Sequence, residues 1–196
     1  MLDSELTFSH HINLIARKCI HQLRQLRVVS RTLTYQSRLA LVHAFVTRRI
    51  DCCCSLLAGL PLGTLARLDR VLRSAARLVG GLSKCSSITA YMRDVLHWLP
   101  TCISERIQYR IAAMVSHCVL GCAPSYIHDL CCPVSVLAAR PVLRSAAKGE
   151  FLVHQARLAI MQRRAFLIEG PAAWNDLPFE LHSLLMAHPS KFNFVG

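Results

Sequence analysis

The chain has 196 residues; 53% are hydrophobic, 23 are arginine or lysine and 11 are acidic, which gives a formal net charge of +12. This length predicts one domain with a sizeable core and an irregular tail. Arginines interrupt every apolar run before it reaches the roughly 20 residues that span a bilayer, which argues against a transmembrane helix.

The basic residues are mostly arginine, 19 of the 23. The planar guanidinium group offers several hydrogen-bond donors that suit phosphate. In an otherwise apolar chain, such an excess favours a polyanionic partner, above all nucleic acid. The alternative is a merely basic surface, because codon composition alone can favour arginine.

Apolar residues recur at helical spacing through about the first 120 positions and predict helices. Ser9 is the expected N-cap of the first helix. The apolar stripe of that helix comprises Ile12, Ile15, Cys19, Leu23 and Leu26. A second helix is expected over residues 34–49, with a buried side formed by Leu39, Val42, Phe45 and Val46.

The third predicted helix, TLARLDRVLRSAARLVGG, carries arginine on one face. At about 100° per residue, an arc of roughly 120° contains Arg67, Arg70, Arg73 and Arg77. The opposite side is apolar, and Gly80 and Gly81 are expected to end the helix. Contacts between the four arginines and phosphates would produce a strong salt dependence of binding. The alternative is a solvated polar face that happens to use arginine.

A short helix near residues 89–97 and a longer helix that ends at Gly121 complete the predicted helical region, 1–132. Beyond it, prolines and glycines interrupt the pattern, so residues 133–196 are predicted to be extended or irregular, packed on the helices or loose. Trp98 and Trp174 are expected to be packing anchors rather than platforms for bases. The expected fold class is therefore mostly α: a helical bundle with an irregular C-terminal tail punctuated by proline and glycine.

Ten cysteines raise the question of a metal or redox site. The first ten residues contain acidic but no basic side chains, which argues against a secretory or mitochondrial targeting segment. We therefore expect reduced thiols in an intracellular protein, cytoplasmic or nuclear. At most two of three consecutive thiols can face one metal ion on a helix or a strand. That limit applies to Cys52, Cys53 and Cys54.

A second group of thiols approaches the spacing of zinc ligands, but it matches no standard pattern. It consists of Cys118, Cys122, His128 and Cys131. We expect these side chains to pack as small apolar groups rather than to bind a metal. A small structural zinc-binding protein remains an alternative.

Several segments resemble one protein family, in the family's order. They are HAFVTRRID, SLLAGLP, AARLV, LHWLP with RIQYRI, GCAPSYIHDL and RAFLIEGPAAWNDLPFEL. Together they resemble the C-terminal part of LINE-type, jockey-like non-LTR retrotransposon reverse transcriptases, from residue 2 to about residue 189. The most specific marks are LHWLP and GP-x-x-WN-x-LP. The family usually reads R-x-D-Y-C-N where this chain has RIDCCC, so only Cys53 of the triplet matches it.

The resemblance implies a thumb-like region and the segment after it, which in the family grip the template-primer duplex through its backbone. It places the polymerase palm before Met1. The six aspartates are never adjacent, and the family's catalytic Asp-Asp pair is absent, whereas two-metal phosphoryl transfer needs clustered carboxylates. We therefore expect no catalytic activity, no cofactor, no membrane association and no small-molecule substrate.

The expected function is that of a catalytically inactive fragment of an RNA-directed DNA polymerase. Residual, sequence-nonspecific binding of RNA/DNA duplex would use the backbone-contacting residues Arg67, Arg70, Arg73 and Arg77. One alternative is a poorly packed product of a truncated element copy, without selected activity. The other is the structural zinc protein.

Overall fold

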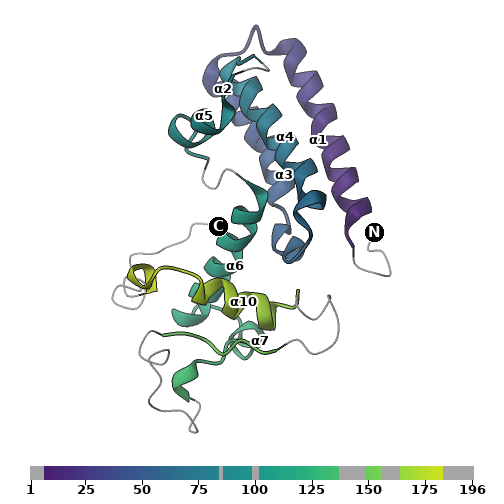
Figure 1. Ribbon diagram of the computed structural model, residues 1–196. Helices are drawn as coiled ribbons and strands as arrows, with labels where there is room; N and C mark the ends of the chain where they lie inside the picture. Colours follow the sequence, from purple (N-terminus) through teal and green to yellow (C-terminus); the bar gives the residue numbers. More distant parts are fainter. Residues whose placement is uncertain (1–6, 84–85, 99–101, 137–148, 156–163, 183–196) are drawn as a thin grey trace. The chain divides into compact units, whose positions relative to one another are not determined.

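The computed structural model of the protein describes residues 7–83, 86–98, 102–136, 149–155 and 164–182. It confirms the mostly α-helical class (Figure 1). In these ranges, β-structure is limited to an isolated antiparallel bridge between Pro133 and Phe151. The chain forms two compact units, Met1–Ile107 and Gln108–Gly196, so the boundary expected at residue 132 falls within the second unit.

The first helix, α1 (Ser9–Val29), buries all five residues of its predicted apolar stripe. Ser9, however, is not the N-cap. Phe8 holds that position with left-handed backbone, at a φ of 54°, and makes no side-chain cap. The Ser9 amide donates instead to Thr7 Oγ1, at 3.5 Å. The prediction of Ser9 as the cap is wrong because the chain enters the helix one residue earlier.

The second predicted helix is a continuous helical run of three parts. It comprises α2 (Tyr35–Val42), the π-helical η1 (His43–Thr47) and α3 (Arg48–Asp51). Thr34 caps the run, because the Ser37 backbone N–H donates to Thr34 Oγ1 at 3.2 Å.

The π-helical turn changes which side chains of this run are buried. Val42 and Val46 are fully buried, as predicted, and Ile50 continues their four-residue spacing. Phe45 is 44% exposed, so its predicted burial is wrong, and Leu39 is only partly buried. A π-helical turn contains more residues than an α-helical one, and it therefore shifts the face that points to the core.

The third predicted helix is α4 (Leu62–Gly80), which lies beside α1 (Figure 1). It follows the short 3-10 turn η2 (Cys54–Leu57) and precedes α5 (Ile88–Asp94). Gly81 ends α4 in left-handed backbone, at a φ of 62°, as predicted. The buried side of α4 carries Leu65, Leu68, Val71, Leu72, Ala75, Ala76, Leu78 and Val79.

The next helix, α6 (Ile103–Val119), begins in the first unit, where a carboxylate from α4 caps it. Asp69 Oδ1 accepts a hydrogen bond from the Ile103 backbone N–H at 2.8 Å. A carboxylate at this end offsets the positive pole of the helix dipole. Trp98, just before α6, is 4% exposed and meets the His43 ring edge-on, with 5.4 Å between centroids. Trp98 is thus a packing anchor, as predicted.

The second unit contains the rest of α6, α7 (Ser125–His128), η3 (Val134–Val136) and α10 (Phe166–Asn175). Much of the tail predicted over residues 133–196 lies outside the described residues. Its described part includes an extended segment, 149–155, and the helix α10 where irregular chain was expected. The buried core of this unit comprises Val115, Cys118, Cys131, Phe151 and Trp174.

Two neighbouring side chains of α10 hold the extended segment. Trp174 is fully buried, and its Nε1 donates to the Gly149 carbonyl at 3.1 Å. Asn175 Oδ1 accepts from the Phe151 backbone N–H, and Asn175 Nδ2 donates to the Phe151 carbonyl, both at 2.9 Å. The side-chain amide thus satisfies backbone groups that a neighbouring strand would otherwise pair. Trp174 is a packing anchor, as predicted.

Candidate nucleic-acid interface

The arginine face of α4 has the orientation that its spacing predicts. Arg67, Arg70 and Arg73 are exposed, opposite the buried side of the helix. Arg77 is only partly exposed, and its buried Nε has no hydrogen-bond partner among the described residues. Three of the four predicted arginines are therefore freely accessible from solvent, whereas Arg77 is partly drawn into the protein.

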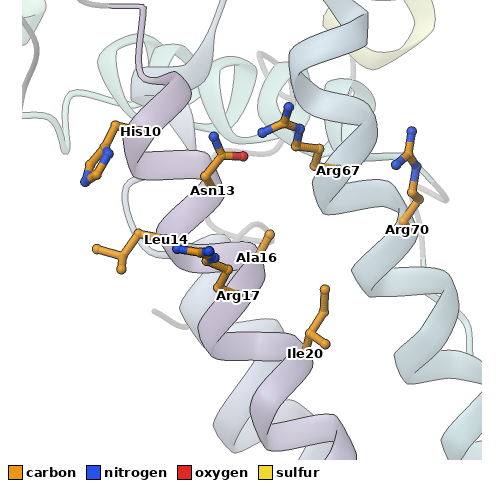
Figure 2. Close-up of a pocket in the computed structure, with 8 residues that line it drawn as sticks. All are labelled: His10, Asn13, Leu14, Ala16, Arg17, Ile20, Arg67 and Arg70. Atoms are coloured by element: carbon orange, nitrogen blue, oxygen red, sulfur yellow. The ribbon is translucent and has the colours of Figure 1, made fainter.

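Two of these arginines line an open groove between α4 and α1, with a volume of about 580 Å³ (Figure 2). Arg67 and Arg70 belong to α4, and in Figure 2 the Arg67 side chain extends from α4 toward α1. The α1 wall consists of His10, Asn13, Leu14, Ala16, Arg17 and Ile20. The groove therefore brings together cationic side chains from helices far apart in sequence. Arg73 and Arg77 do not line it.

Sequence reasoning missed the polar residues that α1 contributes: His10, Asn13 and Arg17. A signal for them was present, because residues 6–50 contain eight arginines and lysines and no acidic residue. On a helix, such a stretch presents positive charge on every solvent-facing side. The exposed cations of α1 are Arg17, Lys18, Arg24 and Arg27.

The electrostatic balance of this region is strongly positive. Residues 7–83 contain twelve arginines and lysines but only two acidic residues, Asp51 and Asp69. Asp51 is paired with Arg106 of α6, and Asp69 caps α6 through the Ile103 amide. Among the residues that the structure describes, no carboxylate lines the groove. The positive potential of the groove is thus not offset from within, which favours an anionic ligand.

The lining of the groove suits phosphates better than bases. Guanidinium, imidazole and amide groups can all donate hydrogen bonds to phosphate oxygens. Base recognition in single strands relies on aromatic side chains as stacking platforms, and no described Trp, Tyr or Phe side chain lines this groove. The arrangement can therefore contact a nucleic-acid backbone without reading its sequence.

The structure does not gather the four residues with zinc-like spacing. Cys118 and Cys131 are buried, and burial, with Cys118 as its neighbour, raises the pKa of Cys131 to about 12. Cys122 and His128 are exposed. In the part of the chain that the structure describes, no group of three or more His, Cys, Asp or Glu side chains is placed to hold a metal ion.

No family model matches the sequence, and no curated protein and no solved structure matches it either. None of the helices in the described ranges is long and apolar enough to cross a membrane. The groove and its charge are therefore the basis for a functional assignment.

Proposed function

We propose that the protein is a catalytically inactive remnant of a retrotransposon reverse transcriptase that binds nucleic-acid backbones without sequence preference. The observation that carries the binding proposal is that Arg17, Arg67 and Arg70 line one groove to which no carboxylate of the described residues contributes. The ancestry rests on the sequence resemblance described above. Together they favour a thumb-like grip on a duplex such as RNA/DNA hybrid.

Some residues that carry the resemblance have structural roles, which supports the idea that they are inherited features of a fold. Asp51, in HAFVTRRID, pairs with Arg106, in RIQYRI. Trp174 and Asn175, in GPAAWNDLP, hold the extended segment of the second unit. None of these side chains lines the groove, so the motifs and the proposed binding surface can be tested separately.

The test is binding of the full-length protein to a labelled RNA/DNA hybrid over a series of salt concentrations. Three phosphate contacts predict a log-log salt slope of roughly 2 to 3, and thus a loss of affinity of a few tens-fold between about 50 and 200 mM salt. A triple variant, Arg17→Gln, Arg67→Gln and Arg70→Gln, should lose this slope. Hybrids of unrelated sequence should bind equally well, because backbone contacts carry no sequence information.

A matched control removes the same number of charges elsewhere: Arg31→Gln, Arg48→Gln and Arg93→Gln. All three arginines are exposed, and none lines the groove. Its slope should stay close to that of the unaltered protein. Equal losses in the two triple variants would assign binding to net charge and would refute the groove. Adding Arg73→Gln and Arg77→Gln to the groove variant shows whether the remaining predicted arginines contribute.

The competing assignment is a poorly packed product without a selected activity. It is favoured by large apolar side chains that stay exposed, among them Val28 at 81%, Leu62 at 72% and Tyr126 at 69%. This assignment predicts concentration-dependent association and a broad, non-cooperative unfolding transition. Sharp unfolding of a monomer, with saturable binding to the hybrid, would exclude it.

A further inference from the structure

Among the described residues that line the groove, His10 is the only one whose charge can change near neutral pH. It is exposed in the first turn of α1 and shares the groove with Arg17, Arg67 and Arg70 (Figure 2). Arginine is always charged in proteins, whereas histidine gains or loses a proton between about pH 5 and 8. The number of cations in the groove therefore depends on the protonation of His10. The remaining lining residues do not titrate: they are Asn13, Leu14, Ala16 and Ile20.

The spacing along α1 places His10 on the same side of the helix as a second cation of the groove. Arg17 follows it by seven residues, which is almost two turns, so the two side chains differ by only about 20° around the helix axis. Along the axis they are roughly 10 Å apart. A protonated His10 would therefore extend the positive wall that α1 contributes, opposite Arg67 and Arg70 of α4.

The described surroundings of the His10 ring provide positive but no negative charge. The first turn of α1 contains no acidic residue, and Phe8 makes no side-chain cap, so nothing described there offsets the positive pole of the helix. The neighbouring His11 ring meets Phe8 edge-on, with 6.3 Å between centroids. From α4, the charged groups that line the groove are Arg67 and Arg70. A phosphate in the groove would supply the negative charge that a protonated His10 needs.

We propose that the groove binds nucleic-acid phosphate together with one proton, which the ring nitrogen of His10 that lacks a proton takes up from the solvent. This inference rests on the function proposed above. The protonated ring donates from both nitrogens, and a charged donor makes a stronger hydrogen bond to a phosphate oxygen than a neutral one. Because the coupling is reciprocal, a phosphate that favours the protonated ring is itself bound more tightly when the ring is protonated. The affinity should therefore increase as the pH falls from about 8 to 5.

The experiment is the salt series with labelled RNA/DNA hybrid and full-length protein, carried out at about pH 7.5 and 5.5 to cover the range of histidine titration. The unaltered protein should bind about 10-fold more tightly at the lower pH. Its log-log salt slope should be steeper there by roughly 0.9, the increment of one further phosphate contact. Asp3 and Glu5 lie outside the described residues, and carboxyl groups ordinarily titrate at about pH 4, below this window.

Two replacements of His10 give opposite expectations. His10→Gln removes the titratable group and should abolish the pH dependence of both the affinity and the slope. His10→Lys places a permanent charge at the same position and should show the steeper slope at both pH values. Because the side chain is exposed, neither replacement should unfold α1, and circular dichroism at both pH values checks this.

The matched control is His21→Gln, because His21 is exposed on the same helix but does not line the groove. This variant should keep the pH dependence of the unaltered protein. An equal loss in His10→Gln and His21→Gln would assign the effect to overall charge and overturn the role of His10. Salt-dependent binding that does not change with pH would overturn it as well, while leaving the proposed function intact. An absence of saturable binding at both pH values would refute the proposed function and this inference with it.

Discussion

Arg106 Nη1 donates to both carboxylate oxygens of Asp51, at 3.2 and 3.4 Å, and so joins two segments 55 residues apart. The two side chains are only 11% and 19% exposed. The Arg106 guanidinium carbon also lies 6.0 Å from the centroid of the buried Trp98 ring. The pair therefore joins the start of α6 to the end of α3 within the first unit, in a partly desolvated environment.

We expect Asp51→Ala to lower the free energy of unfolding by about 2 kcal/mol, because Arg106 would keep its charge without its partner. Urea denaturation followed by circular dichroism measures the change. Asp94→Ala is the control, since Asp94 pairs with Arg93 where both side chains are more than half exposed. Such surface pairs contribute ~0–1 kcal/mol, so a similar cost for both variants would contradict the role given to Asp51.

Because the Asn175 side chain is hydrogen-bonded to the Phe151 backbone, we expect even a nearly isosteric substitution of Asn175 to lower the stability of the second unit. Asn175→Asp keeps the shape of the side chain but replaces the donating Nδ2 by an oxygen that faces the Phe151 carbonyl. We expect a loss of about 2 to 3 kcal/mol in the stability of the second unit, measured by urea denaturation. Asp176→Asn, at the exposed neighbouring position, should change stability little. Equal effects at the two positions would show that the hydrogen bonds between Asn175 and the Phe151 backbone do not stabilise the fold.

Cys131 predicts a loss of stability in alkaline solution. Burial is the main cause that raises its pKa to about 12, from an ordinary value of 9.0. Because the folded-state pKa is the higher one, the stabilisation is complete below pH 9 and is lost as the pH rises toward 12. The free energy of unfolding should therefore fall across this window. Tyr91, whose pKa burial also raises to about 12, adds to the fall in the first unit.

The variant Cys131→Ala isolates the thiol contribution. Its free energy of unfolding should fall less steeply with pH above pH 9, because one fewer group releases a proton on unfolding. Its stability at neutral pH should be lower. Cys122→Ala removes an exposed thiol and should keep the profile of the unaltered protein. A profile unchanged by Cys131→Ala would show that this thiol does not titrate on unfolding.

Two glycines of α4 should respond oppositely to alanine. A Cβ at Gly63 would meet nothing within 4 Å, so Gly63→Ala should stabilise the protein by about 0.5 to 1 kcal/mol. At Gly80 the added Cβ would lie 2.7 Å from Cζ of Tyr91. The Tyr91 ring, which is hydrogen-bonded to Tyr35, would have to shift, so we expect Gly80→Ala to cost about 1 kcal/mol. Thermal unfolding of both variants checks the signs, and a gain at Gly80 would contradict the contact.

Helical periodicity predicted α1 and α4 because it reports directly which side chains face a core. It failed at Phe45, where a π-helical turn shifts the phase. The capping preference of serine failed separately at Ser9, because Phe8 is the N-cap. The prolines and glycines after Cys132 predicted irregular chain, yet α10 forms because Trp174 and Asn175 find partners 24 or 25 residues away. Such tertiary contacts leave no periodic signal.

The candidate interface was predictable only in part for the same reason. The spacing of the arginines places Arg67 and Arg70 on the exposed side of α4. The opposite wall comes from α1, and its contribution of Arg17 depends on how the two helices pack. Their pairing is not encoded in the periodicity of either one. The absence of acidic residues over positions 6–50 was the available clue, because it predicts positive charge irrespective of packing.

The use of Asp51 and Asp69 to fix α6 has a thermodynamic consequence for the first unit. With both carboxylates engaged, the remaining cations of residues 7–83 repel one another, and bound anions would reduce that repulsion. Unfolding spreads these charges apart, so multivalent anions should bind the folded form better and act as folding ligands. Sulfate would then raise the melting temperature more than chloride at equal ionic strength. A bound polyanion would accordingly neutralise these cations and stabilise the folded first unit.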